Sequence, residues 1–222
     1  MASRLLLVFT VLTGVALAPL AHAQTWPTKP LRVVVPFTPG SATDTIARTV
    51  SAQLSTQLAQ PIVVENRPGA GGTIGAAVVA KSDPDGYTLL VHSSSHTVTP
   101  STYATLPYDT VAEFAGITPL GNIPSVLVVA PAKAFRSLAD LVTAARARPG
   151  SMNYASAGQG SAAHLNAERF RLSGRFEAVH VPFRGAPEAL TEVMQERVDF
   201  YFCPVLPALP MLSVRPGTLG VA

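Results

Sequence analysis

Short β-branched runs alternate with helix-length segments along this 222-residue chain, and that alternation restricts its fold more than any other feature. Residues 31–35 form an apolar run of strand length, and beyond Ser41 apolar side chains recur every four residues, at positions 46, 50, 54 and 58. Strands are then expected at 62–65 and 87–92, with a helix at 72–81 between them. This β-α-β-α-β order predicts a parallel sheet covered by helices, with ligand sites at the carboxyl ends of the strands.

The alternation stops at residues 97–124, where four prolines and no sustained period predict a crossing between two lobes, with a short hydrophobic stretch at 114–117. It then resumes, with strands expected at 125–130, 152–156, 178–182 and 198–202 and helices at 137–148, 161–172 and 186–196. The sequence therefore predicts two α/β lobes, residues 24–122 and 123–222, each a mainly parallel sheet flanked by helices.

Two loops of small residues connect a strand to a helix, one in each expected lobe. In the first, Pro36 and Pro39 fix the exit from the strand, and Gly40-Ser41-Ala42 leaves the backbone approachable. Ser41 and Asp44 resemble a capping box, which places a helix N-terminus, with free amides and the positive end of its dipole, at the end of the loop. Residues 156–161 repeat this arrangement. Either the loops only cap their helices, or together they hold an anion in a cleft.

The expected ligand-binding residues lie in these two loops and at the carboxyl ends of neighbouring strands. Ser93 and Ser94 follow the strand that His92 ends, and Arg184 follows the strand at 178–182, where it either pairs with a carboxylate or faces solvent. His164 is interpreted as a hydrogen-bonding or packing residue beside a helix cap. The full expected set is Phe37, Thr38, Gly40, Ser41, Ala42, Asp44, Ser93, Ser94, Ser156, Ala157, Gly158, Gly160, Ser161, His164, Arg184 and Gly185.

The catalytic motifs around the serines are incomplete. A nucleophile elbow needs glycine two positions before and two after the serine, but Tyr154 precedes Ser156 and Ala163 follows Ser161. An exported hydrolase stays the alternative function, although no motif places a base beside a nucleophile. We therefore expect no catalytic residue.

Cofactor and metal motifs are incomplete as well. The glycine-rich stretch at 69–75 has Ile74 where a dinucleotide fingerprint needs glycine, so a tight strand-to-helix turn is the preferred interpretation. His92 and His96 lack a neighbouring cysteine or carboxylate that would complete a metal site. We therefore expect no cofactor and no metal.

The first 23 residues have the pattern of a secretory signal peptide. Arg4 precedes an apolar run at 5–20, and Ala21-His22-Ala23 forms a small-x-small cleavage site. The run is short for a membrane span, so an uncleaved anchor is the less favoured alternative. We expect cleavage near Ala23 and a soluble periplasmic protein without a lipid anchor. Cys203, the only cysteine, excludes an intramolecular disulfide.

The charge pattern disfavours nucleic acid as a partner. The formal net charge is +3, and the sixteen lysines and arginines are scattered along the sequence rather than clustered. A mild positive balance is compatible with a small anionic ligand.

Several motifs together closely resemble the substrate-binding proteins of tripartite tricarboxylate transporters, also called Bug receptors. They are residues 31–48, Val-Glu-Asn-Arg-Pro-Gly-Ala-Gly-Gly-Thr-Ile-Gly at 64–75, Asp-Pro-Asp-Gly-Tyr-Thr-Leu-Leu at 83–90, Leu-Pro-Tyr-Asp at 106–109, Tyr-Ala-Ser-Ala-Gly at 154–158 and Val-Pro-Phe-Arg-Gly at 181–185. The resemblance implies a two-lobe periplasmic binding protein fold that captures a small carboxylate between its lobes. It also implies delivery to the membrane permease subunits of a transporter, or to a sensor, and we expect a monomer.

This chain departs from the family pattern in two places. Gly40-Ser41 stands where the family usually has two glycines, and family members continue well beyond the point that matches residues 219–222. The resemblance therefore implies a C-terminally truncated chain whose first lobe is incomplete, which we expect to be less stable than an extended chain and to bind carboxylates weakly or not at all. An inactive remnant is the alternative.

Overall fold

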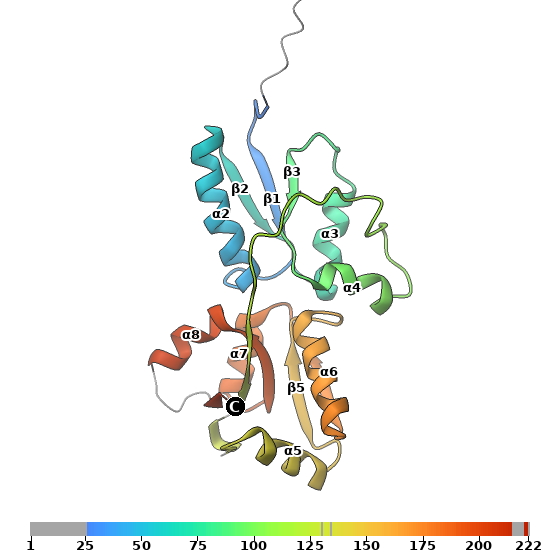
Figure 1. Cartoon of the computed structure of the whole chain (residues 1–222), viewed down its shortest axis with the longest axis vertical. Coiled ribbons are helices and arrows are strands. Elements are labelled where there is room, and N and C mark those ends of the chain that lie inside the picture. Colours follow the sequence, from blue (N-terminus) through green and yellow to red (C-terminus); the bar gives the residue numbers. More distant parts are fainter. Residues whose placement is uncertain (1–25, 130, 134, 215–219, 222) are drawn as a thin grey trace, which may run out of the picture.

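The computed structural model describes residues 26–129, 131–133, 135–214 and 220–221, so the expected signal peptide lies outside the described residues. Two α/β bodies are stacked along the long axis of the molecule, each with its own sheet (Figure 1). We call the body that contains β1 to β3 the first lobe and the body that contains β4 to β8 the second lobe.

The first lobe is a three-stranded parallel sheet in the order β2-β1-β3 within the described residues. Val33 of the central strand lies opposite Val64 and Leu89, and with Val35 and Ala47 it forms a small buried core. The elements are β1 (Leu31–Val35), α2 (Ala42–Leu58), β2 (Ile62–Asn66), the 3₁₀ turn η1 (Ala70–Gly72), α3 (Thr73–Ala80), β3 (Thr88–Leu90) and α4 (Ser95–Thr102).

The second lobe is a five-stranded sheet in the order β6-β5-β7-β4-β8. Strand β4 is antiparallel to both of its neighbours, so four of the five described strands run in one direction. The elements are β4 (Ser125–Val129), the 3₁₀ turn η2 (Pro131–Lys133), α5 (Leu138–Ala147), β5 (Met152–Ser156), α6 (Ala162–Gly174), β6 (Ala178–Pro182), α7 (Ala186–Met194), β7 (Phe200–Pro204), α8 (Val205–Val214) and β8 (Gly220–Val221).

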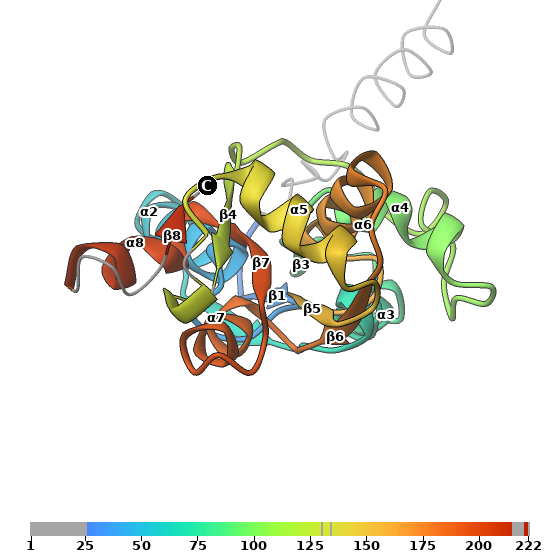
Figure 2. The same ribbon diagram turned by 90° about the horizontal axis from the view of Figure 1, so that it is seen from below.

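Helices cover both faces of the second sheet, which can be followed from below in Figure 2. Successive side chains of a strand point to opposite faces. Accordingly Tyr201 of β7 packs with Leu190 and Val193 of α7, whereas Phe200 packs with Leu141 of α5 on the other side. This two-faced core fixes the positions of the loops at the carboxyl ends of β5 and β6.

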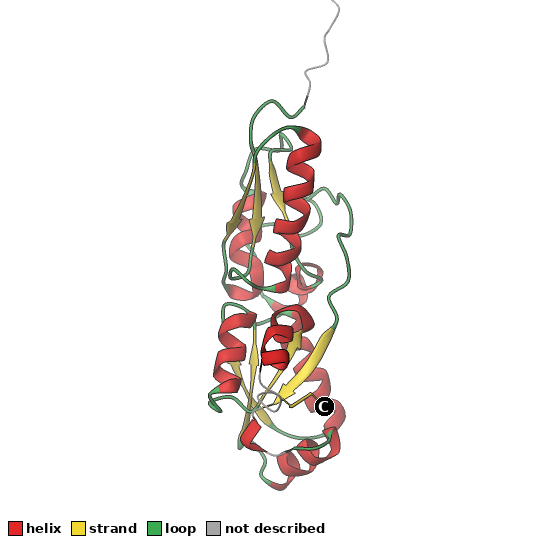
Figure 3. Cartoon of the chain, turned by 90° about the vertical axis from the view of Figure 1, so that its left-hand side faces the viewer, coloured by secondary structure: helices red, strands yellow, loops and turns green. Residues whose placement is uncertain are grey.

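The predicted fold class is confirmed, but two helices appear where the sequence predicted none. Helix α4 overlaps the expected crossing at residues 97–124. It was not predicted because its buried positions are Ser95 and Thr99, which carry no hydrophobic period. Helix α8 contains Pro210, a residue that normally ends a helix. The crossing itself, residues 103–124, lacks regular structure in the described chain and runs along one side of the molecule as a long loop (Figure 3).

The end of the described chain belongs to the second sheet. Residues Gly220–Val221 pair with β4, so this strand extends the second lobe rather than the first. The lobe boundary between residues 122 and 123 stays a prediction.

Candidate ligand-binding site between the lobes

A cavity of about 1000 Å³ lies where the two lobes meet. Its walls include the first residues of α2 and of α6, the segment that follows β3, residues 117–124 of the crossing and Ser125 of β4. No aspartate, glutamate, lysine or arginine lines it among the described residues. Apolar side chains form much of the wall, including Val33, Ile46, Val50, Leu54, Leu89 and Phe202.

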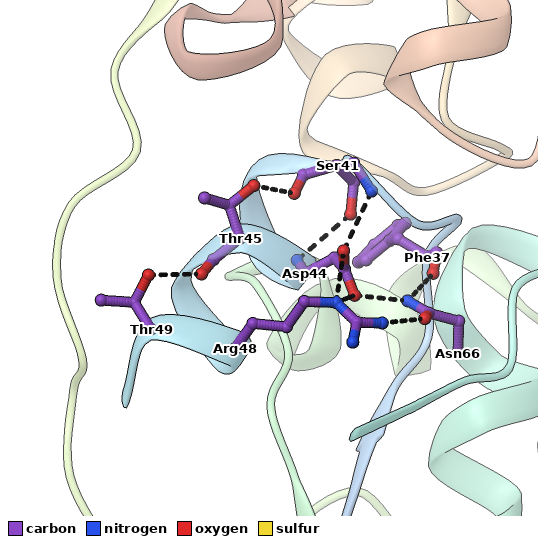
Figure 4. A network of polar contacts seen from close by, with 8 residues as sticks. Phe37, Ser41, Asp44, Thr45, Arg48, Thr49 and Asn66 are labelled. Atoms are coloured by element: carbon purple, nitrogen blue, oxygen red, sulfur yellow. Dashed lines mark hydrogen bonds and ion pairs between the residues drawn. The ribbon is translucent and has the colours of Figure 1, made fainter. Parts of the chain in front are cut away.

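The first loop reaches this cavity at the N-terminus of α2, and the polar contacts among Ser41, Asp44, Arg48 and Asn66 are drawn in Figure 4. Ser41 is the N-cap residue, and its Oγ accepts a hydrogen bond from the Asp44 amide at 3.3 Å. The Gly40 amide donates to Asp44 Oδ2 at 2.9 Å, and the Ser41 amide donates to the Thr38 carbonyl at 3.1 Å. The helix therefore leaves the amides of Ala42 and Thr43 as the N–H groups without a partner within the helix or its cap.

Asp44 holds this loop in place and does not line the cavity. Its carboxylate is buried and accepts hydrogen bonds from Gly40, Arg48 and Asn66, and Asn66 also donates to the carbonyl of Phe37. Desolvation raises the pKa of Asp44, but the hydrogen bonds from Arg48, Gly40 and Asn66 together outweigh it and hold that pKa below its usual value. Asp44 is therefore ionised and supports the loop as a charged anchor.

The second loop repeats this construction at the N-terminus of α6. Ser161 Oγ accepts from the His164 amide at 3.3 Å, the Gly160 amide donates to His164 Nδ1 at 3.2 Å, and the Ser161 amide donates to the Gly158 carbonyl at 3.1 Å. Gly40 and Gly160 both have a positive φ, 79° and 75°, which glycine tolerates best. The second helix therefore leaves the amides of Ala162 and Ala163 free in the same way.

A stack of aromatic rings supports the second loop from behind. The rings of His164 and His180 are 4.1 Å apart, and Tyr154 stacks on both. Burial lowers the pKa of His164, and it lowers the pKa of His180 to about 4, so both rings are neutral near pH 7. His180 Nε2 lies 2.6 Å from Ser156 Oγ, which in turn accepts a hydrogen bond from the Gly158 amide.

Ser156 is therefore a loop anchor. It is fully buried and does not line the cavity, so its contact with His180 faces the interior of the lobe. A serine beside a histidine in this position lacks the exposure that a nucleophile needs.

The residues after β3 form a third wall of the cavity. Ser93 and Ser94 line it, and Ser93 Oγ lies 2.7 Å from Ser95 Oγ. His92 Nδ1 accepts a hydrogen bond from the Ser93 amide at 2.8 Å. Burial, reinforced by the nearby charge of His96, lowers the pKa of His92 to about 3, so this ring adds no positive charge to the wall.

No group of three or more His, Cys, Asp or Glu side chains that could hold a metal occurs in the part of the chain that the structure describes. The rings of His92 and His96 lie 5.1 Å apart.

Several expected ligand-binding glycines lie where the lobes touch instead of in the cavity wall. A Cβ on Gly158 would lie 2.7 Å from the Gly71 amide of the first lobe, and one on Gly160 would lie 2.9 Å from Thr102. The Gly185 backbone packs directly against Thr38 in the same manner. Tyr103 adds a hydrogen bond across this contact, because its hydroxyl donates to the Gln159 carbonyl at 3.0 Å. Arg184 is exposed and does not line the cavity.

The structure thus brings part of the expected set together in one cavity. The expected residues that line it are Phe37, Ser41, Ala42, Ser93, Ser94, Ala157 and Ser161. Gly40 lines a separate pocket of about 350 Å³ with Pro187 and Leu206. Thr38, Asp44, Ser156, Gly158, Gly160, His164, Arg184 and Gly185 do not line the larger cavity.

Sequence reasoning missed the apolar part of the wall described above and three further kinds of lining residue. Thr43, Ala162 and Ala163 could have been found, because the first positions after an N-cap always carry free amides. The crossing residues 117–124 and the buried Tyr201 carry no sequence signal of this role, since only the packing of the lobes brings them to the cavity.

Residues 46–220 match the protein family described as "Tripartite tricarboxylate transporter family receptor". The chain belongs to this family. Among its relatives, Protein BugT of Bordetella pertussis is 39% identical over 189 residues, which cover 84% of this chain and 57% of that protein. The family of the resemblance is thereby confirmed.

Solved receptors of similar fold carry small acids. The Rpa4515 protein of R. palustris with adipate has a TM-score of 0.84 and 33% identity, covering 88% of this chain and 65% of the other. The protein MatC from Rhodopseudomonas palustris with bound malate has a TM-score of 0.80 and 29% identity, covering 88% and 66%. The chain spans less than two thirds of the length of each of these proteins.

The receptor family consists of solute-binding proteins rather than enzymes, which disfavours the alternative of an exported hydrolase. One solved relative is described as the periplasmic binding protein BugD. Within the described residues, no helix combines the length and the apolar character that a membrane crossing requires.

Proposed function

We propose that this chain captures a small carboxylate in the cavity between its lobes, in the periplasm, for delivery to membrane permease subunits or to a sensor. The observation that supports this proposal most strongly is the pairing of two helix N-termini at one cavity, each with two free amides, at Ala42 and Thr43 and at Ala162 and Ala163. Free amides and the positive end of the helix dipole favour an anion at such a place.

Neutral donors are sufficient for this task. Hydrogen bonds to a carboxylate are about twice as strong as those between neutral groups, and a water-poor cavity strengthens them further. The neutral His92 and the hydroxyl of Ser41 fit the same pattern. A cationic ligand would find no acidic side chain in the described wall.

Similarity to solved receptors supports small carboxylates as the ligand class. The two solved receptors described above hold adipate and malate, which are both dicarboxylates. Because the chain spans less than two thirds of these receptors, its ligand, its transporter partner and its monomeric state are part of the proposal.

Calorimetric titration with adipate and with its diamide tests the proposal. We expect adipate to bind, and the diamide, which has no charge, to bind at least tenfold more weakly. Equal binding of the two compounds would contradict carboxylate capture. No binding of adipate, malate or benzoate would contradict capture by this chain and would agree with the alternative of an inactive remnant.

A proline at the first position of α6 removes one proposed donor with little damage to the helix, because that position tolerates proline well. We expect Ala162→Pro to weaken adipate binding by roughly 10- to 100-fold, the usual effect of losing a hydrogen bond to a charged group. The control is Leu138→Pro, at the first position of α5 behind the extended N-cap Ser137, outside the cavity wall. It should leave the affinity unchanged.

A further inference from the structure

His180 of β6 is joined to the second loop by a short hydrogen bond, since its Nε2 lies 2.6 Å from Ser156 Oγ. Across the sheet His180 lies opposite Tyr154, which precedes Ser156 by two positions in β5. Residues two apart in a strand point to the same face of the sheet. The imidazole therefore lies on the same face as the Ser156 side chain and reaches it diagonally.

The contacts of Ser156 Oγ determine which group donates in this bond. The Gly158 amide donates to Oγ at 3.0 Å, and the hydroxyl donates to the Gly158 carbonyl at 3.2 Å. A serine hydroxyl has one proton and two acceptor lone pairs. Because that proton is directed to Gly158, the bond to His180 must be donated by its Nε2–H. Burial lowers the pKa of His180 to about 4, so near pH 7 the ring carries one proton, which the geometry places on Nε2.

The loop that this bond holds carries part of the cavity wall and part of the contact between the lobes. Ala157 lines the cavity, and the Gly158 backbone packs against Gly71 of the first lobe. The carbonyl of Gly158 accepts a hydrogen bond from the amide of Ser161, the N-cap residue of α6. A shift of Gly158 would therefore move the start of α6 and the contact with the first lobe together.

Stacking alone does not explain an imidazole at position 180. The ring of His180 stacks on those of Tyr154 and His164, with centroids 5.0 and 4.1 Å away, and a phenylalanine ring could stack there as well. An imidazole costs more free energy to bury than a phenyl ring unless its N–H has a partner. The hydrogen bond to Ser156 is thus the property that distinguishes histidine from phenylalanine at this position.

We propose that His180 is a positioning residue for ligand capture, whose Nε2–H fixes Ser156 Oγ and thereby holds the second loop in its binding conformation. His180 lies outside the described cavity wall, so it acts through Ser156 rather than by touching the ligand. The affinity for a carboxylate then depends on an N–H donor at this point and not on an aromatic ring. This inference rests on the proposed carboxylate capture.

Two substitutions separate the donor from the ring. His180→Phe keeps a stacking ring and removes the donor, whereas His180→Gln removes the ring and keeps an amide N–H at the place of Nε2. In calorimetry with adipate, we expect His180→Phe to weaken binding by about tenfold or more, the effect of leaving a buried polar group without its partner. His180→Gln should recover the affinity to within about threefold of the parent. A loss in His180→Gln as large as that in His180→Phe would overturn the role of the donor.

Ser156→Ala completes a double-mutant cycle with His180→Phe. Alone it should weaken adipate binding by about tenfold or more, because the Gly158 amide loses its acceptor. Adding His180→Phe to Ser156→Ala should change the affinity by less than about twofold, since the shared bond is already lost. Additive losses would show that His180 acts independently of Ser156 and would overturn the proposal.

Asn153→Ala is the control for a general loss of stability in β5. It removes the Oδ1 that accepts from the Asp199 amide at 2.9 Å, at the opposite end of the strand from the second loop. We expect a lower melting temperature and an unchanged affinity for adipate. An affinity loss equal to that of His180→Phe would show that weakening the strand is sufficient, and would overturn the specific role of His180.

Nitrogen NMR of the imidazole rings at pH 7.5 observes the bond without ligand. His180 should have a protonated Nε2 and an unprotonated Nδ1, and the reverse would overturn the assigned donor. If the parent binds adipate and His180→Phe binds it equally well, the positioning role is overturned while carboxylate capture stands. If the parent binds neither adipate nor malate, capture by this chain falls and the positioning role falls with it.

Discussion

At the scale of single residues, Gly158 connects the second loop to the packing of the lobes. From the sequence we expected Gly158 to leave the amides of the second loop approachable by a ligand. In the structure its own amide donates to Ser156 Oγ at 3.0 Å. The structural need is different. Gly158 has a φ of 105°, and its Cα side faces the Gly71 backbone of the first lobe, where no side chain fits.

Gly158→Leu should therefore push the lobes apart and reduce carboxylate affinity by at least about tenfold, because the strained φ and the blocked contact each cost about 1–3 kcal/mol. Calorimetry measures the affinity, and thermal unfolding should show a lower melting temperature. Gly116→Leu is the control, since Gly116 has no neighbour within 4 Å of an added Cβ. If Gly158→Leu binds as tightly as the parent, close contact at this point is not needed for binding.

The sequence identified loop residues well and wall residues poorly. Ser41 and Ser161 were predictable, because an N-cap serine is a local signal that depends on its own helix. Tyr201 and residues 117–125 depend on how distant segments pack, and no local pattern reports that. Arg184 was considered for the wall because of its charge, yet it is exposed and outside the cavity.

At the scale of elements, α2 and α6 begin with the same hydrogen bonds but use different side chains to make them. The Gly40 amide donates to the carboxylate of Asp44, whereas the Gly160 amide donates to the imidazole of His164. A carboxylate with a lowered pKa keeps accepting in mild acid. An imidazole can accept a hydrogen bond only while it is neutral. As the pH falls, the bond from Gly160 to His164 should therefore be lost before the bond from Gly40 to Asp44.

We therefore expect the free energy of unfolding to fall as the pH drops from 7.5 to 5. Burial lowers the pKa of His164 below 6.5, while Tyr154 and His180 stack on it and the charge of Glu168 opposes the shift. Below about pH 6.5 this histidine is protonated more readily in the unfolded chain than in the folded chain. The contribution of the neutral ring to the free energy of unfolding is therefore present above about pH 6.5 and is lost as the pH falls below it. The loss is up to roughly 1.4 kcal/mol per pH unit for each such histidine.

Urea unfolding at pH 7.5 and 5.0 measures this difference. His164→Asn keeps an oxygen that can accept from Gly160 without titrating, so its loss of stability should be smaller than that of the parent chain. Equal stability of the parent at both pH values would contradict the expected effect of these buried histidines.

Element boundaries were predictable where local patterns dominate. Strands β5 and β6 occupy the expected residues, because apolar alternation and flanking turn residues define them. Strand β7 begins at Phe200 instead of residue 198. At its start the Asp199 amide donates to Asn153 Oδ1 at 2.9 Å, and the Asn153 amide donates to Asp199 Oδ2 at 2.8 Å. These side-chain bonds accompany a backbone bond from the Asp199 amide to the Asn153 carbonyl at 3.3 Å, and the hydrophobic pattern does not reveal them.

At the scale of the whole molecule, the two lobes present equivalent helix N-termini to one cavity, which has no charged side chain among its described lining residues. The two-lobe architecture was predictable, because the alternation of strands and helices restarts after a proline-rich crossing. The cavity and the glycine contacts that bound it depend on the relative placement of the lobes, and a single sequence contains no direct signal of that placement.

Backbone amide NMR during titration with adipate tests the central claim most directly, because it observes the proposed donors themselves. We expect the amide signals of Ala42, Thr43, Ala162 and Ala163 to shift downfield together and to saturate with one dissociation constant. The amides of Gly40 and Gly160, already bound to Asp44 and His164, should shift less. Saturable binding that leaves all four donor signals in place, with shifts elsewhere in the chain, would contradict carboxylate capture between the two helix N-termini.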